Sequence, residues 1–159
     1  MCFAIDAAMD MVNMSIELAE KTEDSRYYMD SMKLHKLLYL SQCAMLKTHK
    51  RSLFRDKIWA CRCGPYVDGI KSIPAKRGFG LIKDRFSREA DDFVPPSVAR
   101  RDILNRTLEE FGKKSTEELI QLTKNSTPYL KARRESAQTK DPEITRESMT
   151  NDRSLPQAG

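Results

Sequence analysis

Apolar side chains recur at helical spacing through the first fifty residues of the chain. Between Ile5 and Glu20 they fall three or four residues apart, which predicts an amphipathic helix with one buried face. Residues 32–48 carry apolar side chains on most sides of a helix and leave little polar surface. A helix of that kind is normally buried. We therefore expect residues 32–48 to form a central helix, capped by Ser31, that organises the core.

The pattern changes in the middle of the chain, where apolar and basic residues alternate. Over about 53–61 the apolar positions are two or four residues apart, which is typical of a strand. Gly64-Pro65 interrupts that alternation, and residues 66–75 fit a short helix. A second short strand is predicted over about 80–86. We expect the two strands to pair as a small ribbon.

The last third of the chain predicts further short helices. One is expected over 97–111, with Gly112 as its C-terminal cap. Residues 115–118 have the form of a capping box, which begins another helix. Asp141 and Pro142 favour the start of a final helix, because proline is well tolerated at the first helical position.

These elements predict a mainly α fold: a compact single-domain helical bundle around the central helix, with a small two-stranded β element. At 159 residues the chain fits one domain, expected over 1–151, with 152–159 as a disordered tail. No apolar run approaches the roughly 20 residues of a membrane span. Asp6 and Asp10 interrupt the first segment, which therefore does not resemble a signal peptide. Four cysteines without a secretion signal indicate reduced thiols and a cytoplasmic protein.

The net charge of +5 is concentrated in one part of the chain. Between residues 47 and 88 there are twelve basic and three acidic side chains, which gives this segment a charge of +9. Such a block attracts an acidic partner, either a protein or a nucleic acid. The charge alone does not choose between them.

Aromatic residues lie among these cations, as they do in proteins that bind nucleic acid. Phe54 and Trp59 are interleaved with Lys47, Lys50, Arg51, Arg55, Lys57 and Arg62. If the alternation turns Phe54 and Ile58 toward the core, Trp59 points outward. An outward tryptophan on a basic ribbon is typical of an anchor in a protein interface. A protein-binding surface and a nucleic-acid-binding regulator therefore remain alternatives.

The residues that commonly carry catalysis or bind metals do not form a recognisable site. Cys61 and Cys63 are a C-x-C pair, whereas zinc sites usually show C-x-x-C with a second ligand pair. Arg62 and the basic surroundings would lower a thiol pKa, which leaves a redox role as a minor alternative. His35, on the central helix, fits a hydrogen-bonded structural histidine. No nucleotide-binding or hydrolase motif is present, so we expect no enzyme activity, metal or cofactor.

Several segments, in order, resemble one known family. Residues 32–42 (MKLHKLLYLSQ) are similar to the K-L-Q-K-L-L-Y-(F/Y)-x-Q stretch of the Panacea domain, found in SocA-like antitoxins and phage-associated proteins. Gly64-Pro65 matches the G-P-V of that family. Residues 111–129 resemble its Y-G…S…L…T-H…P-W ending. Cys61 and Tyr66 stand where the family usually has Trp and Val, and Tyr129 replaces the Trp of P-W.

The resemblance implies an antitoxin-like protein that neutralises or regulates a toxin or other protein partner by direct binding, or a phage or mobile-element accessory protein. The family framework is helical with a small β element, and no metal or nucleotide cofactor is associated with it. The structural motif that carries the resemblance is Lys33, Leu34, Lys36, Leu37, Leu38 and Tyr39. The residues expected to bind the partner are Lys50, Arg51, Arg55, Lys57, Trp59, Arg62, Gly64, Pro65 and Tyr66.

Overall fold

The computed structural model describes residues 2–73, 80–87, 97–135 and 141–155. Within them the chain is mainly α-helical with one small antiparallel sheet, which confirms the predicted fold class. The elements, in chain order, are α1 (Ala4–Thr22), η1 (Ser25–Tyr27), α2 (Ser31–His49), β1 (Ile58–Cys61), β2 (Gly64–Val67), α4 (Val98–Phe111), α5 (Thr116–Lys124), α6 (Thr127–Glu135) and α7 (Arg146–Thr150).

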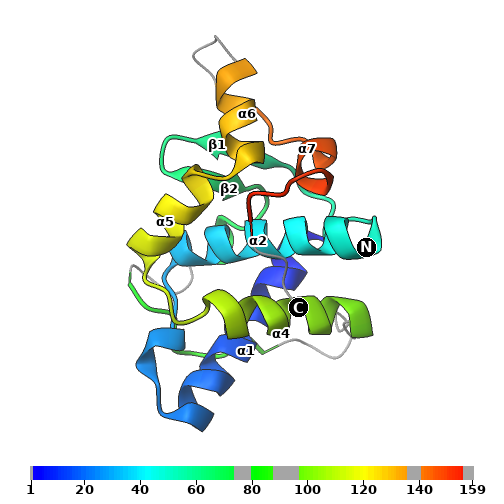
Figure 1. Ribbon diagram of the computed structural model, residues 1–159. Helices are drawn as coiled ribbons and strands as arrows, with labels where there is room; N and C mark the ends of the chain where they lie inside the picture. The colour runs from blue at the N-terminus through cyan, green and yellow to red at the C-terminus, as the bar shows by residue number, and fades with distance from the viewer. Residues whose placement is uncertain (1, 74–79, 88–96, 136–140, 156–159) are drawn as a thin grey trace.

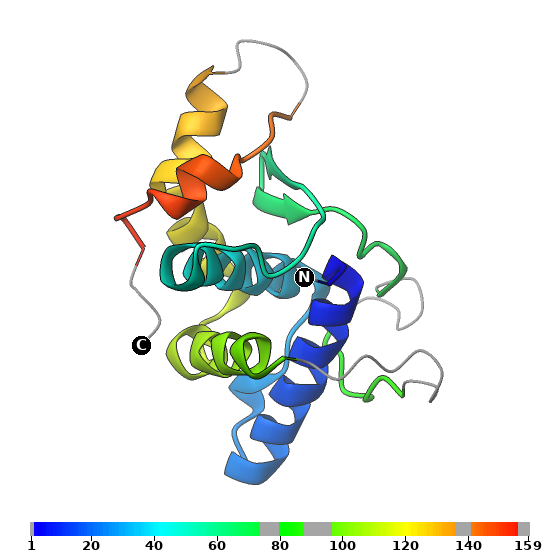
Figure 2. The same cartoon turned by 90° about the vertical axis from the view of Figure 1, so that its right-hand side faces the viewer.

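Helix α2 lies at the centre of the fold, as its apolar sequence predicts. It contacts α1, α4, α5, α7 and β2, and every residue from Lys33 to Leu46 is buried. In both views α4 lies beside α2 on one side, α1 crosses the two helices, and the β-hairpin lies on the opposite side of α2 (Figures 1 and 2). The N-cap of α2 is Asp30 rather than the predicted Ser31, because the Asp30 carboxylate accepts the backbone N–H of Lys33 at 2.7 Å.

Local signals placed α4 and α5 correctly. Ser97 caps α4 by accepting the Arg100 N–H at 3.1 Å, and Gly112 is its C-terminal cap. Ser115 and Glu118 form the predicted capping box of α5. The final helix begins later than predicted. Thr145 is the N-cap of α7.

Two strands form the predicted ribbon, but the first covers only Ile58–Cys61 of the predicted 53–61, and the second is not the one predicted. β1 pairs with β2 at Gly64–Val67, where a break and a short helix were expected. Residues 80–86 make only an isolated bridge, between Ile82 and Met29, within the part of the chain that the structure describes. The predicted helix over 66–75 is wrong for its first residues, and 74–79 lie outside the described residues.

The position of Pro65 in the ladder explains how a proline fits into β2. Pro65 lies opposite Ala60, whose N–H donates away from β2 to the carbonyl of Pro142 at 2.7 Å. This is therefore a non-hydrogen-bonded pair, in which Pro65 has no N–H to supply to β1. The Ile144 N–H also donates to the Ile58 carbonyl at 2.8 Å, so residues 142–144 cover the outer edge of β1.

The first part of the segment expected as a tail is packed. The side chains of Asp152 and Leu155 are buried, and Lys47 makes an ion pair with Asp152 at 3.2 Å. Residues 156–159 lie outside the described residues. No helix in the described ranges has the length and apolar composition needed to cross a membrane.

Candidate partner-binding surface

The hairpin places two aromatic side chains on one face. Trp59 and Tyr66 are directly opposite in the antiparallel register, so their side chains project to the same side of the ribbon. Both are partly exposed, whereas Ile58, Ala60 and Val67 on the other side are buried. The predicted inward direction of Phe54 and Ile58 is confirmed, since both are at most 1% exposed. The outward position predicted for Trp59 follows from the same alternation.

Buried residues of α2 contact the outer edge of β2 and one member of this aromatic pair. His35 accepts the backbone N–H of Val67 on Nδ1 at 2.9 Å, and its ring stacks on that of Tyr66 with centroids 4.3 Å apart. Burial, together with the neighbouring charge of Lys36, lowers the pKa of His35 to about 3. The imidazole is therefore neutral at physiological pH. It is the hydrogen-bonded structural histidine predicted from the sequence.

Lys36 is a buried ammonium beside the outer edge of β2. Its side chain donates to the Pro65 carbonyl at 3.1 Å, and burial lowers its pKa to about 8. Lys33, one turn earlier, is also buried, but it donates to the carbonyls of Arg26 and Gly112, each at 2.7 Å. Both lysines of the family motif therefore stabilise segments that pack against α2, by donating hydrogen bonds to backbone carbonyls of those segments.

Gly64 and Pro65 shape the hairpin from within. Both are buried, and Gly64 has a φ of +104° that side-chain-bearing residues rarely adopt. A Cβ at Gly64 would also lie 3.2 Å from Cε of Lys36. Their predicted contact with a partner stays a prediction, and their burial favours an indirect contribution through the shape of the turn.

Helix α6 holds β1 through two side chains that the sequence did not single out for this role. The Tyr129 hydroxyl donates to the Cys61 carbonyl at 2.5 Å. Arg133 donates to the Ala60 carbonyl at 2.9 Å and makes an ion pair with Asp141 at 3.3 Å. The Pro-Tyr pair at the end of the motif series was a signal for Tyr129, whereas Arg133 lies in a plain run of polar residues.

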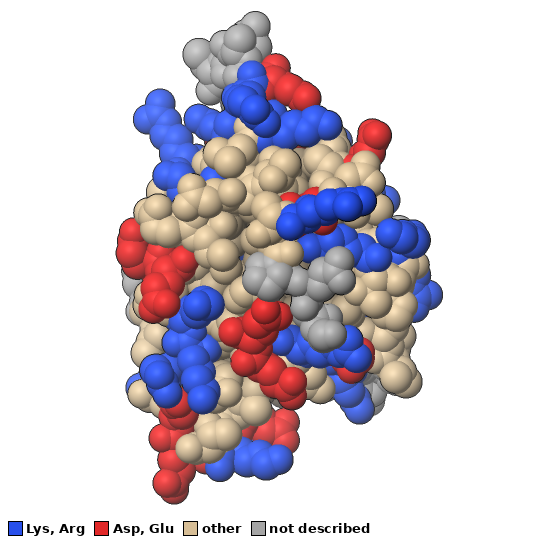
Figure 3. Space-filling view, in the orientation of Figure 1, with Lys and Arg blue, Asp and Glu red and all other residues tan. Residues whose placement is uncertain are grey.

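The structure divides the predicted cations between two surfaces. Lys57 lies over the Trp59 ring, with Nζ 5.9 Å from its centroid, and Arg62 is exposed in the hairpin turn. Lys50 and Arg51 instead border a separate pocket with Phe3. The remaining cation, Arg55, lies over the Phe3 ring at 5.3 Å, between the two surfaces. Figure 3 shows Lys and Arg side chains gathered over the end of the molecule formed by α6 and the hairpin.

The cysteines do not show the electrostatics of a reactive pair. Burial, reinforced by Asp141, raises the pKa of Cys61 to about 11, which contradicts the lowered value expected from the basic surroundings. Burial also raises the pKa of Cys43 to about 12. All four thiols are free. Among the described residues no group of three or more His, Cys, Asp or Glu side chains is arranged to bind a metal.

Comparison with known families places this surface in context. The sequence model of the family described as "Antitoxin SocA-like, Panacea domain" matches residues 34–129, well over half of the chain. The matched range begins in α2 and ends in α6, so it contains the hairpin and its supports. Neither the curated proteins nor the solved structures contain a significant match to the chain.

Proposed function

Because the chain belongs to the antitoxin SocA-like, Panacea domain family, we propose that it neutralises or regulates a toxin or other protein partner by binding it directly. The family match is the observation that carries this proposal. The binding surface is the outer face of the hairpin, with Trp59 and Tyr66 at its centre and Lys57 and Arg62 beside them. We call these four residues the hairpin surface.

The geometry of the hairpin surface supports a role in protein binding. Aromatic anchors contribute most of the affinity in many interfaces, especially where their geometry is set before binding. Here the backbone of β1 is held by Tyr129, by Arg133 and by residues 142–144, and Tyr66 is stacked on His35. A partner would therefore meet a surface that needs little ordering. The cations at its edge favour a partner with an acidic rim.

We extend the proposal to the setting of this activity. The chain acts in the cytoplasm, as the four free thiols favour. It belongs to a phage or other mobile element, as the resemblance of its motifs to those of phage-associated proteins implies. It works by binding and catalyses no reaction.

Co-expression with the products of neighbouring genes tests the proposal. We expect the chain to suppress the toxicity of one of them and to co-purify with it. Trp59→Ala should weaken the complex by about 30-fold or more, as expected for an interface hot spot. Leu81→Ala, which shortens an apolar side chain that is 53% exposed outside the hairpin, is the matched control and should bind normally. If no neighbouring product is bound or neutralised, the antitoxin proposal is wrong.

Binding to nucleic acid through segment 47–88 is the second candidate. It is favoured by the exposure of five of the six cations interleaved with the aromatic residues, namely Lys50, Arg51, Arg55, Lys57 and Arg62. The sixth, Lys47, is largely buried in its ion pair with Asp152. Phe54, one of the two interleaved aromatics, is fully buried and offers no face for stacking. Gel-shift assays at low salt discriminate the two functions: a complex that is lost when Arg51, Arg55 and Lys57 are replaced would favour this candidate, and no complex would exclude it.

A further inference from the structure

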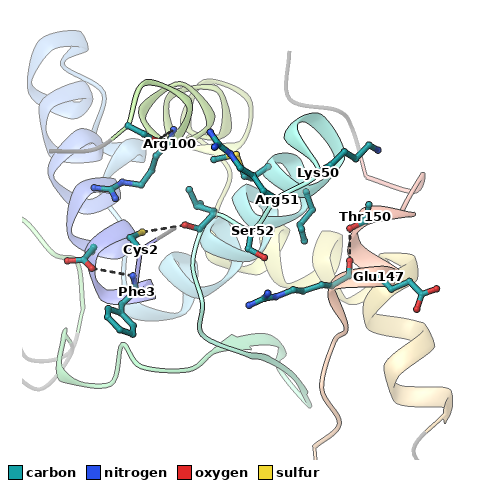
Figure 4. A pocket seen from close by; sticks show the side chains of 14 residues that line it. Cys2, Phe3, Lys50, Arg51, Ser52, Arg100, Glu147 and Thr150 are labelled. Carbon is teal, nitrogen blue, oxygen red and sulfur yellow. Dashed lines mark hydrogen bonds between the residues drawn. The ribbon is translucent and has the colours of Figure 1, made fainter. Parts of the chain in front are cut away.

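A second concave surface lies away from the hairpin surface. It is a pocket of about 820 Å³ bordered by the N-terminal ends of α1 and α4, the loop that follows α2, and α7 (Figure 4). Its apolar lining comes from Cys2, Phe3, Met45, Leu46 and Leu53. Its charged lining comes from Lys50, Arg51, Arg100, Arg146, Asp6 and Glu147. We call it the arginine pocket.

Arg100 gives the arginine pocket a buried cation with an unused hydrogen-bond donor. The residue is 6% exposed, and its Nη2 pairs with Asp10 at 2.9 Å. Its Nε has no hydrogen-bond partner, the one such case among the buried side-chain nitrogen and oxygen atoms of the described residues. A buried donor without an acceptor is unfavourable, so such groups in native proteins usually have a functional or structural reason.

Two further arginines border the pocket without a carboxylate partner. Arg51 is exposed, and Arg146 donates from Nη2 only to the backbone carbonyl of Arg55, at 3.2 Å. Neither makes an ion pair within the described ranges of the chain. The two carboxylates of the lining offset only part of the charge of its four cations. Asp6 accepts the Phe3 N–H at 3.3 Å in the capping box of α1, and the Glu147 side chain points away from the labelled arginines in Figure 4.

The positive ends of two helices add to this field. The N-cap residues of α1 and α4, Phe3 and Ser97, both line the pocket. The N-terminal end of a helix carries a partial positive charge that favours anions. The guanidinium groups, the unused donor and the helix ends therefore all favour an anionic ligand. The apolar part of the lining distinguishes that ligand from a bare phosphate, which would leave these side chains uncovered.

We propose that the arginine pocket binds an acidic peptide segment of a protein partner, in which carboxylates flank an apolar side chain. The carboxylates pair with Arg51 and Arg146 and bring an acceptor to the wall formed by Arg100, since the guanidinium fork matches a carboxylate. The apolar side chain covers Leu53 and its neighbours. This inference rests on the proposed function in taking the ligand to be a protein segment. It concerns a surface separate from Trp59 and is testable without the partner.

Nuclear magnetic resonance titration of the full chain tests the pocket directly. The probe is an acetylated, amidated pentapeptide in which two glutamates flank a leucine, and its control has glutamines in place of the glutamates. We expect the acidic peptide to shift the Arg100 Nε–H signal and the Ser52 amide, and the glutamine peptide to leave both unchanged. The double variant Arg51→Glu/Arg146→Glu should weaken binding by at least about tenfold. The matched control is Lys131→Glu/Arg134→Glu, two exposed cations of α6, which should bind as the parent does.

Several outcomes would overturn the proposal. Equal shifts with the glutamine peptide would indicate a purely apolar groove. Shifts with inorganic phosphate or a thymidine oligonucleotide, but not with the acidic peptide, would indicate another class of ligand. Binding that survives Arg51→Glu/Arg146→Glu would place the peptide elsewhere. Trp59→Ala should leave the titration unchanged, so failure of the pocket and failure of the hairpin surface are distinguished.

Discussion

Replacing Lys36 with methionine tests whether the lysine beside β2 is a buried cation. Methionine keeps an unbranched apolar stem of similar length, so the packing should be preserved while the charge is removed. Lys36 is 3% exposed, and the only hydrogen bond that its ammonium makes within the described residues is to the Pro65 carbonyl. Burial therefore disfavours the charged form in the folded state.

The expected effect on stability follows from the change in pKa. Burial lowers the pKa of Lys36 from its ordinary value of 10.5 to about 8. The unfolded chain therefore binds more protons than the folded chain between these two values, and the free energy of unfolding rises with pH across this window. From pH 7 to pH 10 the Lys36 contribution should be a gain of about 2.5 kcal/mol. Lys36→Met should lack this gain.

Urea denaturation of both proteins at pH 7 and pH 10 measures the difference. Both should carry Cys63→Ser, because the Cys63 side chain interacts electrostatically with Lys36. Cys61, with a pKa of about 11, remains a thiol throughout. Other titrating groups affect both proteins alike and cancel in the comparison. Lys131→Met, at an exposed lysine, should keep the parental pH dependence. If the free energy of unfolding changes equally for Lys36→Met and its parent between the two pH values, the charge on Lys36 is not buried as described.

Three further substitutions test the supports of the hairpin and core by thermal or urea denaturation. Gln42→Leu should lower the free energy of unfolding by about 2–4 kcal/mol, because the buried amide forms hydrogen bonds with backbone groups of residues 53–54. A decrease smaller than about 1 kcal/mol would contradict this prediction. Gly64→Ala should be more destabilising than Gly80→Ala, since both glycines have positive φ but only Gly64 is close to another side chain. If both substitutions lower the free energy of unfolding equally, steric contact at Gly64 makes no contribution. Tyr39→Phe removes a buried hydroxyl pair at 2.6 Å and should lower stability by about 1 kcal/mol, whereas an unchanged midpoint would refute that contribution.

The sequence alone was sufficient for the helical framework. The period of apolar residues identified α1 and the burial of α2, because both depend on which side chains share a helix face. The capping residues Gly112 and Ser115 placed helix ends to within a residue, because a cap is a local interaction. The direction of Phe54 and Ile58 followed from alternation in the same way. The ordered motifs around α2 and Gly64-Pro65 also identified the family.

Pairings between distant segments were decided only by the tertiary structure. Pro65 predicts a break in a strand unless its position in the ladder is known, and that depends on where Ala60 directs its N–H. The continuous run of positive charge in the sequence was divided when the fold carried Lys57 to the hairpin surface and Arg51 to the arginine pocket. The support from Arg133 likewise arises only when α6 packs beside β1. Helix faces and caps are set by neighbours a few residues away, whereas strand pairing and surface charge depend on contacts that residues far apart in the sequence make after folding.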